Sequence, residues 1–398
     1  MKLALDGLRI LDLADEKGMF CSRLLGDMGA DVIKVEPPGG DPLRQRGPYL
    51  GEVPHPGRSL NFWHLNASKR GITLDIESAE GREILKRLVV TADVVVETFP
   101  PGYLDKLGLS YHDLSKVNPR LILASITGFG QTGPRKNFHC DDLVASALGG
   151  QMYLSGERDT PPLKPYGQQS YHIASLFAAI GILLALLSRR FSGRGQYLDL
   201  SLVEATAAVT EHVNIRYHDE GVVAKRQGSL SWSGAFRAFP CRNGYIMLSL
   251  FRNWETLVEW LLSEGMAQDL KQEKWRHEET RRLNLGHIAS VLERWTKTHS
   301  ADELCQRGQL MGFPWAKVCS PKHVVSNPQL KERRFFTPLI HPELGKKITY
   351  AGAPYKFSKL GWRIFKPPLI GEHNDEIYQG ELGLSAKKVH ALASRGII

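Results

Sequence analysis

Three glycines with the spacing of a nucleotide-binding fingerprint lie in the first half of the chain, at Gly128, Gly130 and Gly133. They follow an apolar segment, residues 121–126, that predicts a β-strand. A dinucleotide fingerprint opens a helix at once, but here Pro134 and a polar run follow. We therefore do not expect NAD or FAD. The glycines instead leave backbone N–H groups uncovered at the carboxyl edge of a predicted sheet, where α/β proteins bind ligands.

A second cluster, His139, Cys140, Asp141 and Asp142, follows a few residues later. Adjacent residues cannot all face one metal ion, and no CxxC or HxxxH motif elsewhere supplies partners. Cys140 has no base placed beside it that would make its thiol a nucleophile. This leaves the aspartates. Asp142 begins an apolar helical run, so it is either the N-cap of that helix or a nucleophilic carboxylate at the helix N-terminus, and the two roles are compatible.

The elements that have to position these residues alternate between strand and helix. Short apolar segments rich in β-branched residues predict strands, and amphipathic segments between them predict helices. The expected strands are 8–13, 31–35, 71–75, 93–97, 121–126 and 197–201, and the expected helices are 20–28, 78–90, 142–148, 172–189 and 203–217. This alternation predicts an α/β fold with a large, doubly wound, Rossmann-like parallel sheet.

The composition changes at about residue 225, which indicates a second domain. Six of the eight tryptophans lie between 225 and 325, together with a charge-laced helical stretch at 255–300. We therefore predict a large domain from 1–224, a smaller α+β domain at 225–325, and a return of 326–398 to the large domain.

Charge and cysteine content exclude some classes of protein. Of the 398 residues, 42% are hydrophobic and 23% charged, as in ordinary globular proteins. Five cysteines without a CxxC pair, and no secretory signal at the N-terminus, favour the cytoplasm. The apolar run 173–187 is too short to span a bilayer and predicts a buried core helix. The net charge of +9 lies mostly at 331–370 and indicates a solvated basic face, since the sequence carries no helix-turn-helix, zinc-finger or RNA-binding signature.

Several further motifs occur in a fixed order along the whole chain. They are residues 5–12, 29–38 with Gly40, Asp41 and Arg44, Asn66 with Lys69 and Arg70, 93–99, 118–122, 128–134, 193–196 with Asp199 and Glu204, 371–374 and 382–384. In this order they resemble the family III CoA-transferases, the group of formyl-CoA transferase, carnitine CoA-transferase and the CoA-transferases of aromatic acid breakdown. The resemblance implies transfer of CoA from an acyl-CoA to a carboxylic acid through a mixed aspartyl anhydride, with no metal and no permanently bound cofactor.

The same resemblance implies a site and an architecture. Asp142 would be the nucleophile, and Gly130 and Gln131 would donate to the developing oxyanion. Family members are homodimers of two interlocked ring-shaped subunits. The loop from Gly228 to Gly234 stands where they carry a mobile loop over the intermediate, and a plain linker is the alternative. The residues expected around CoA are Lys17, Arg44, Leu74, Thr98, Phe99, Lys106 and Arg135.

The chain also departs from the formyl-CoA transferase pattern. A charged Asp15-Glu16-Lys17 segment replaces a neutral one, and Pro37 and Thr127 stand where that enzyme has an arginine and a lysine. We therefore expect a dicarboxylyl-CoA such as succinyl-CoA as the donor.

Two alternatives stay open. The first is an acyl-CoA racemase or CoA isomerase of the same fold. A racemase needs two bases, and the positions that they occupy carry Asp141 and Ser170 here. The second, from a different class, is a non-catalytic CoA- or nucleic-acid-binding protein.

Overall fold

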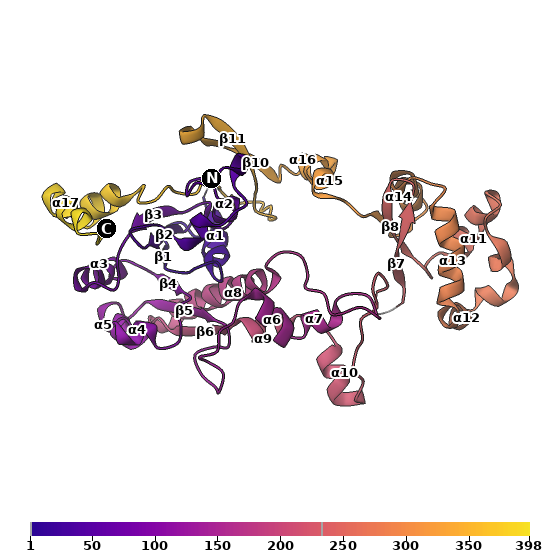
Figure 1. Ribbon diagram of the computed structural model, residues 1–398, viewed down its shortest axis with the longest axis horizontal. Coiled ribbons are helices and arrows are strands. Elements are labelled where there is room, and N and C mark those ends of the chain that lie inside the picture. Colours follow the sequence, from indigo (N-terminus) through magenta and orange to yellow (C-terminus); the bar gives the residue numbers. More distant parts are fainter. Residues whose placement is uncertain (1, 232–233) are drawn as a thin grey trace. The chain divides into compact units, whose positions relative to one another are not determined.

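The structure is a computed structural model that describes residues 2–231 and 234–398 (Figure 1). Contacts within the chain divide it into two units. The first comprises Met1–Met152, Lys164–Gly221 and Lys331–Ile398, so it contains both ends of the chain. The second comprises Tyr153–Leu163 and Val222–Leu330.

The first unit is built on a six-stranded parallel sheet. Its strands have the order β3-β2-β1-β4-β5-β6, and each neighbouring pair is parallel. This is the strand order of a doubly wound fold, and it confirms the predicted parallel α/β sheet. The strands are β1 (Arg9–Asp12), β2 (Asp31–Glu36), β3 (Arg70–Thr73), β4 (Val94–Glu97), β5 (Ile122–Thr127) and β6 (Tyr197–Ser201).

Both faces of this sheet are buried, which explains why its strands are nearly continuous apolar runs. Leu11, Val95 and Leu123 belong to one core, whereas Ile10 and Val94 belong to the core on the opposite face. The first core is covered by α3 (Ala79–Val89), α5 (Tyr111–Val117) and α17 (Ala386–Ser394). The second is covered by α1 (Met19–Asp27), α6 (Asp142–Leu148), α8 (Gln169–Ser192) and α9 (Leu202–Ala208).

The remaining elements of the first unit connect these layers or extend from them. They are α2 (Leu60–Asn66), α4 (Tyr103–Lys106), α10 (Val213–Glu220), the antiparallel pair β10 (Phe336–His341) and β11 (Lys346–Ala351), and a π-helix at Glu376–Glu381. The helix predicted at 203–217 is in fact two helices, α9 and α10. Between them Glu211 has a positive φ of 58°, which interrupts the helical backbone.

Helix α8 differs most from its prediction. It runs from Gln169 to Ser192, longer than expected, and only one side of it is buried. Its length and apolar composition alone would suit a membrane span. However, α1, α6 and α9 pack against it, while its other side exposes a stripe of large apolar side chains. The stripe consists of Leu176, Phe177, Ile180, Leu183, Leu184 and Leu187.

The second unit has an antiparallel sheet and a tryptophan-rich core. The strands β7 (Phe236–Cys241), β8 (Gly244–Ser249) and β9 (Ala316–Lys317) pair in that order. Five of the six tryptophans counted above, Trp254, Trp260, Trp275, Trp295 and Trp315, lie in one buried cluster, and Trp232 is outside the described residues. Its helices are α11 (Trp254–Ser263), α12 (Glu278–Leu283), α13 (Leu285–Thr296), α14 (Ala301–Leu310) and α15 (Pro321–Ser326). Two short helices, α7 (Gln151–Leu154) and α16 (Pro328–Glu332), each have residues in both units.

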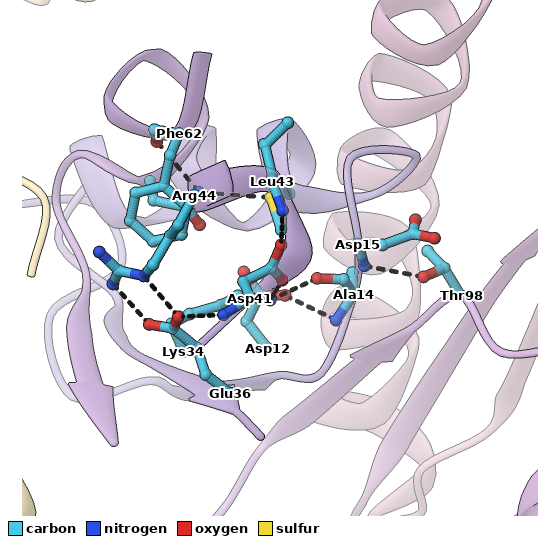
Figure 2. A network of polar contacts seen from close by, with 12 residues as sticks. Asp12, Ala14, Asp15, Lys34, Glu36, Asp41, Leu43, Arg44, Phe62 and Thr98 are labelled. Atoms are coloured by element: carbon cyan, nitrogen blue, oxygen red, sulfur yellow. Dashed lines mark hydrogen bonds and ion pairs between the residues drawn. The ribbon is translucent and has the colours of Figure 1, made fainter. Parts of the chain in front are cut away.

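Buried ion pairs join the carboxyl end of β2 to the loop that follows it (Figure 2). The guanidinium of Arg44 donates to both carboxylate oxygens of Glu36 at 2.6 Å and to the carbonyl oxygen of Pro368 at 2.9 Å. It also lies 3.7 Å from the ring centre of Phe62. Lys34 pairs with Asp41 at 3.3 Å. The end of the chain thereby returns to the sheet, since Pro368 is held by a residue of the N-terminal part.

Removing the Arg44 cation should destabilise the fold strongly. In Arg44→Met, the carboxylate of Glu36, which is almost fully buried, loses its counter-ion, and we expect a loss of about 3–5 kcal/mol in the free energy of unfolding. Arg46→Met is the matched control, because Arg46 is 61% exposed in its pair with Glu16 and should lose less than about 1 kcal/mol. Urea denaturation measures both, and equal losses in the two variants would contradict this account.

Candidate functional site

A cleft of about 650 Å³ opens at the carboxyl ends of strands β1 to β5. The strand order reverses between β1 and β4, and ligands of doubly wound sheets bind at that point. The cleft wall combines apolar surface with a few polar groups. Its lining includes Leu13, Lys17, Pro37, Leu74, Thr98, Phe99, Thr127, Gly128, Lys136 and Cys140.

Four of the residues predicted to surround CoA line this cleft, namely Lys17, Leu74, Thr98 and Phe99. The strands place them there: Leu74 follows β3, and Thr98 and Phe99 follow β4. Thr98 also fixes the N-terminal loop, since its hydroxyl accepts a hydrogen bond of 2.8 Å from the backbone N–H of Asp15.

The other three predicted CoA ligands lie elsewhere. Arg44 is only 1% exposed and fully engaged with Glu36 and Pro368, so its prediction as a phosphate ligand is corrected to a structural role. Lys106 is exposed at the end of α4. Arg135 lines a separate cavity of about 320 Å³, together with acidic neighbours.

The predicted oxyanion donors face a negative charge. The backbone N–H of Gln131 already donates to both carboxylate oxygens of Asp199 at 3.0 Å. Gly130 lies beside the same carboxylate and lines the cavity that also contains Glu204. An oxyanion would be repelled there, so in this structure the two residues serve to bind Asp199 and make the turn. Gly130 has φ of 81°, a backbone conformation that favours glycine.

Asp142 is the first residue of α6 and is only 5% exposed. The N-cap of α6 is Asp141, whose side chain accepts from the backbone N–H of Val144 at 2.9 Å. The carboxylate of Asp142 is therefore not used as a cap. It turns to the start of α8, where Oδ1 accepts from the backbone N–H of Tyr171 at 3.3 Å. Two helix N-termini thus face this one carboxylate and stabilise its negative charge.

Lys164 supplies the counter-ion of Asp142. Its Nζ lies 2.7 Å from Oδ2 of Asp142, and it also donates to the carbonyl oxygens of Pro165, at 3.3 Å, and of Gly167. One ammonium therefore binds the carboxylate and the turn that leads into α8. Asp142 is not among the residues that line the cleft, whereas Cys140, two positions earlier, is.

Cys140 is held tightly and stays a thiol. A Cβ on Gly128 would come within 2.2 Å of the Cβ of Cys140, so glycine is required for this contact. Burial, together with the nearby charge of Asp141, raises the pKa of the Cys140 thiol to about 11. A nucleophilic thiolate is therefore disfavoured at neutral pH.

The structure also shows the residues at the two positions that a racemase would use for its bases, Asp141 and Ser170. Asp141 is occupied as the N-cap, and Ser170 is fully buried and is not a base. His172, close to Ser170 in sequence, packs its ring 4.9 Å from that of Phe20 and 5.9 Å from that of His64. Its Nδ1 donates to the carbonyl oxygen of Gln168 at 2.7 Å. In the described part of the chain, no cluster of metal-ligating side chains occurs.

Comparison with known proteins decides the family. The family model for CoA-transferase family III matches residues 5–374. The chain belongs to this family. It is 37% identical, over 98% of its own length and 97% of the relative's, to the subunit BbsE of a succinyl-CoA:(R)-benzylsuccinate CoA-transferase from Thauera aromatica.

A formyl-CoA:oxalate CoA-transferase from Streptomyces coelicolor is 32% identical over 99% of both chains. Among solved structures, a CAIB/BAIF family protein from Brucella suis superposes with a TM-score of 0.86 at 31% identity, covering 96% of this chain and all of that one. The likeness therefore extends through both units of this family III CoA-transferase.

Two residues of this CoA-transferase, Lys136 and Lys164, went unnoticed in the sequence, and Thr127 was noted only as a difference from formyl-CoA transferase. Lys136 lines the cleft from the loop after the glycine turn. The two adjacent basic residues at 135–136 could have indicated a cation at this place. Thr127 lines the cleft at the end of β5. Lys164 lies in a proline-rich segment that has no motif, so only the folded chain shows its partner Asp142.

Glu97, at the end of β4 beside the cleft, should make stability depend on pH. Burial raises its pKa to about 7, although Ser125 and the backbone N–H of Phe99 donate to its carboxylate. The unfolded chain binds fewer protons than the folded one between pH 4.5 and 7, so the free energy of unfolding falls as pH rises through this range, by on the order of 3 kcal/mol.

Glu97→Gln removes this titration and serves as the reference. The stability of the wild type relative to Glu97→Gln should decrease from pH 5 to pH 8 in urea denaturation, while the contribution of other carboxyls cancels between the two proteins. Parallel curves for the two proteins over this range would refute the assignment.

Proposed function

We propose that this chain transfers CoA from a dicarboxylyl-CoA, such as succinyl-CoA, to an acceptor carboxylic acid. The observation that carries the proposal is the cleft at the carboxyl edge of the sheet, lined by Leu74, Thr98 and Phe99 and by the cations Lys17 and Lys136. Carboxylates line it as well, among them Asp15, which pairs with Lys17. Such a wall suits a ligand with an apolar arm and anionic phosphates. The Thauera relative, named for succinyl-CoA, supports the choice of donor.

Asp142 is the proposed nucleophile of this transfer. A carboxylate oxygen bonds to the thioester carbonyl carbon, the C–S bond breaks, and the CoA thiolate leaves behind a mixed anhydride. The acceptor carboxylate then attacks the aspartyl carbonyl carbon of this anhydride and releases the donor acid. If the thiolate attacks that carbon first, the donor acid leaves, an aspartyl thioester forms, and the acceptor carboxylate then displaces the thiolate from it. The acceptor, now bound to Asp142 as an anhydride, finally receives the thiolate at its carbonyl carbon, and the Asp142 carboxylate is restored.

This role sets a condition on the structure. Asp142 is buried and paired with Lys164, so the contact between Oδ2 and Nζ has to open before the carboxylate can reach a thioester in the cleft. The burial of Asp142 is useful in such a cycle, because it keeps water away from an anhydride that would otherwise hydrolyse. The ammonium of Lys164 and the start of α8 both place positive charge beside the Asp142 carboxylate.

Asp142→Asn should abolish the exchange of CoA between acids. The amide keeps the shape of the side chain but is not a nucleophile, and we expect the rate to fall by a factor on the order of 10⁴ or more. Asp141→Asn is the matched control, since asparagine is also a good N-cap and should leave the rate nearly unchanged. The measurement is the transfer of CoA across a panel of CoA esters and free acids that includes succinate.

A second measurement uses the CoA ester that supports transfer. Protein that is incubated with this ester and then treated with hydroxylamine should be modified by hydroxylamine at Asp142. Exchange at the wild-type rate in Asp142→Asn, combined with a lower free energy of unfolding, would mean that Asp142 only anchors the start of α8. The proposed nucleophile would then be wrong, whereas the proposed transfer would stand.

We further propose that the chain is a homodimer in the cytoplasm. The exposed stripe of α8, with Ile180 53% and Leu184 60% exposed, is apolar surface that a second copy would cover. All five cysteines are free, which suits a reducing compartment. Residues 228–234, the candidate mobile loop, include positions 232 and 233, which lie outside the described residues.

Sedimentation should show twice the 44.5 kDa mass of the chain at micromolar concentration. Ile180→Glu with Leu184→Glu places two charges in the stripe and should shift the protein to the single-chain mass, because a buried unpaired charge opposes association. Val90→Glu, at a residue that is 58% exposed at the end of α3, is the control. A wild type that sediments as one chain, or associates only with a second, related chain, would contradict the homodimer.

A further inference from the structure

The end of β5 contains a buried hydroxyl group that has no partner within the protein. Thr127 is 4% exposed, and its Oγ1 makes no hydrogen bond in the described part of the chain. Leaving a buried hydroxyl without a partner costs free energy, so such groups are rare in folded proteins. Of the described residues with an unpartnered buried side-chain atom, Thr127 is the one that lines the cleft.

The residues next to Thr127 are small and uncharged, although Lys17 and Lys136 line the same cleft. Its backbone pairs with Ser201 of β6, and the next residue, Gly128, packs directly against Cys140. The raised pKa of the Cys140 thiol keeps that neighbour neutral at pH 7. A hydroxyl whose immediate neighbours are uncharged suits a neutral acceptor such as a carbonyl oxygen better than a phosphate, for which a cation would be expected beside it.

We propose that the Thr127 hydroxyl donates a hydrogen bond to a carbonyl oxygen of the bound acyl-CoA, and so is a binding residue for the substrate. The proposal rests on the proposed function for the identity of the ligand. Two carbonyl types of an acyl-CoA share this chemistry, the thioester and the amides of the pantetheine arm. In the free protein the hydroxyl without a partner costs free energy, and the hydrogen bond to the ligand removes this cost.

Thr127→Val tests this by replacing the hydroxyl with a methyl group of the same shape. The urea midpoint of the free protein should stay the same or rise, because an unpartnered polar group has been removed from the interior. Affinity should change in the opposite direction. The Kd for succinyl-CoA, measured by calorimetry without an acceptor acid, should increase about three- to tenfold, and Thr127→Ser should restore it.

Thr206→Val is the matched control. Thr206 is fully buried like Thr127, but its Oγ1 already donates to the carbonyl oxygen of Leu202 at 2.8 Å. Its urea midpoint should fall while the Kd is unchanged. The contrast between the two threonines separates a hydroxyl that serves a ligand from one that serves the fold.

Free CoA distinguishes the two carbonyl types. If Thr127→Val weakens succinyl-CoA and CoA equally, the hydroxyl binds a pantetheine amide; if it weakens succinyl-CoA alone, it binds the thioester. Both results support the proposal. An unchanged Kd for both ligands, or a Thr127→Val protein that loses stability as Thr206→Val does, would overturn it. Because binding is measured without turnover, a protein that binds succinyl-CoA but transfers nothing would contradict the proposed function alone.

Discussion

The need to pair charges buried at the carboxyl edge of the sheet governs this structure. Lys69 is fully buried and donates to Asp12, at the end of β1, and to the carbonyl oxygen of Met19, both within 2.8 Å. Arg44 donates to both carboxylate oxygens of Glu36, at the end of β2. A buried charge left alone would be very costly, so these pairs hold the strand ends, the loops after them and the start of α1 in one arrangement. The floor of the cleft is thereby fixed before any substrate binds.

The cleft above this floor is lined by both charged and uncharged groups. Lys17 and Lys136 are cations that suit the anionic parts of CoA, and Thr127 and Cys140 are uncharged. Asp142 is not among the lining residues, is almost fully buried and has Lys164 as its counter-ion. A site that keeps its carboxylate away from water until substrate is bound is suited to chemistry that passes through an anhydride.

The sequence predicted those features that depend on local pattern. The parallel sheet followed from the alternation of apolar strands and amphipathic helices, and the helix at 142–148 has the expected bounds. Features that depend on distant partners could not be predicted. Arg44 looked like a phosphate ligand because nothing near it in sequence shows that Pro368 would complete its contacts.

The same limit applies to other residues of the site. Gln131 looked like an oxyanion donor until the fold placed the Asp199 carboxylate against its N–H. Likewise, the apolar composition of α8 predicted a core helix, but a single sheet face can cover only one side of it. The sequence predicts which residues could do chemistry, and the fold determines which of them are already occupied.

The central claim is that Asp142 takes part covalently in CoA transfer. It is tested most directly with an acceptor acid whose carboxylate carries heavy oxygen, supplied with succinyl-CoA, followed by mass spectrometry of the digested protein. An anhydride between the acceptor and Asp142 leaves one acceptor oxygen on the aspartate when the thiolate departs with the acyl group. With a single turnover per protein molecule, the account predicts one heavy oxygen on Asp142. Transfer that proceeds while Asp142 stays unlabelled, or label on a different carboxylate, would contradict it.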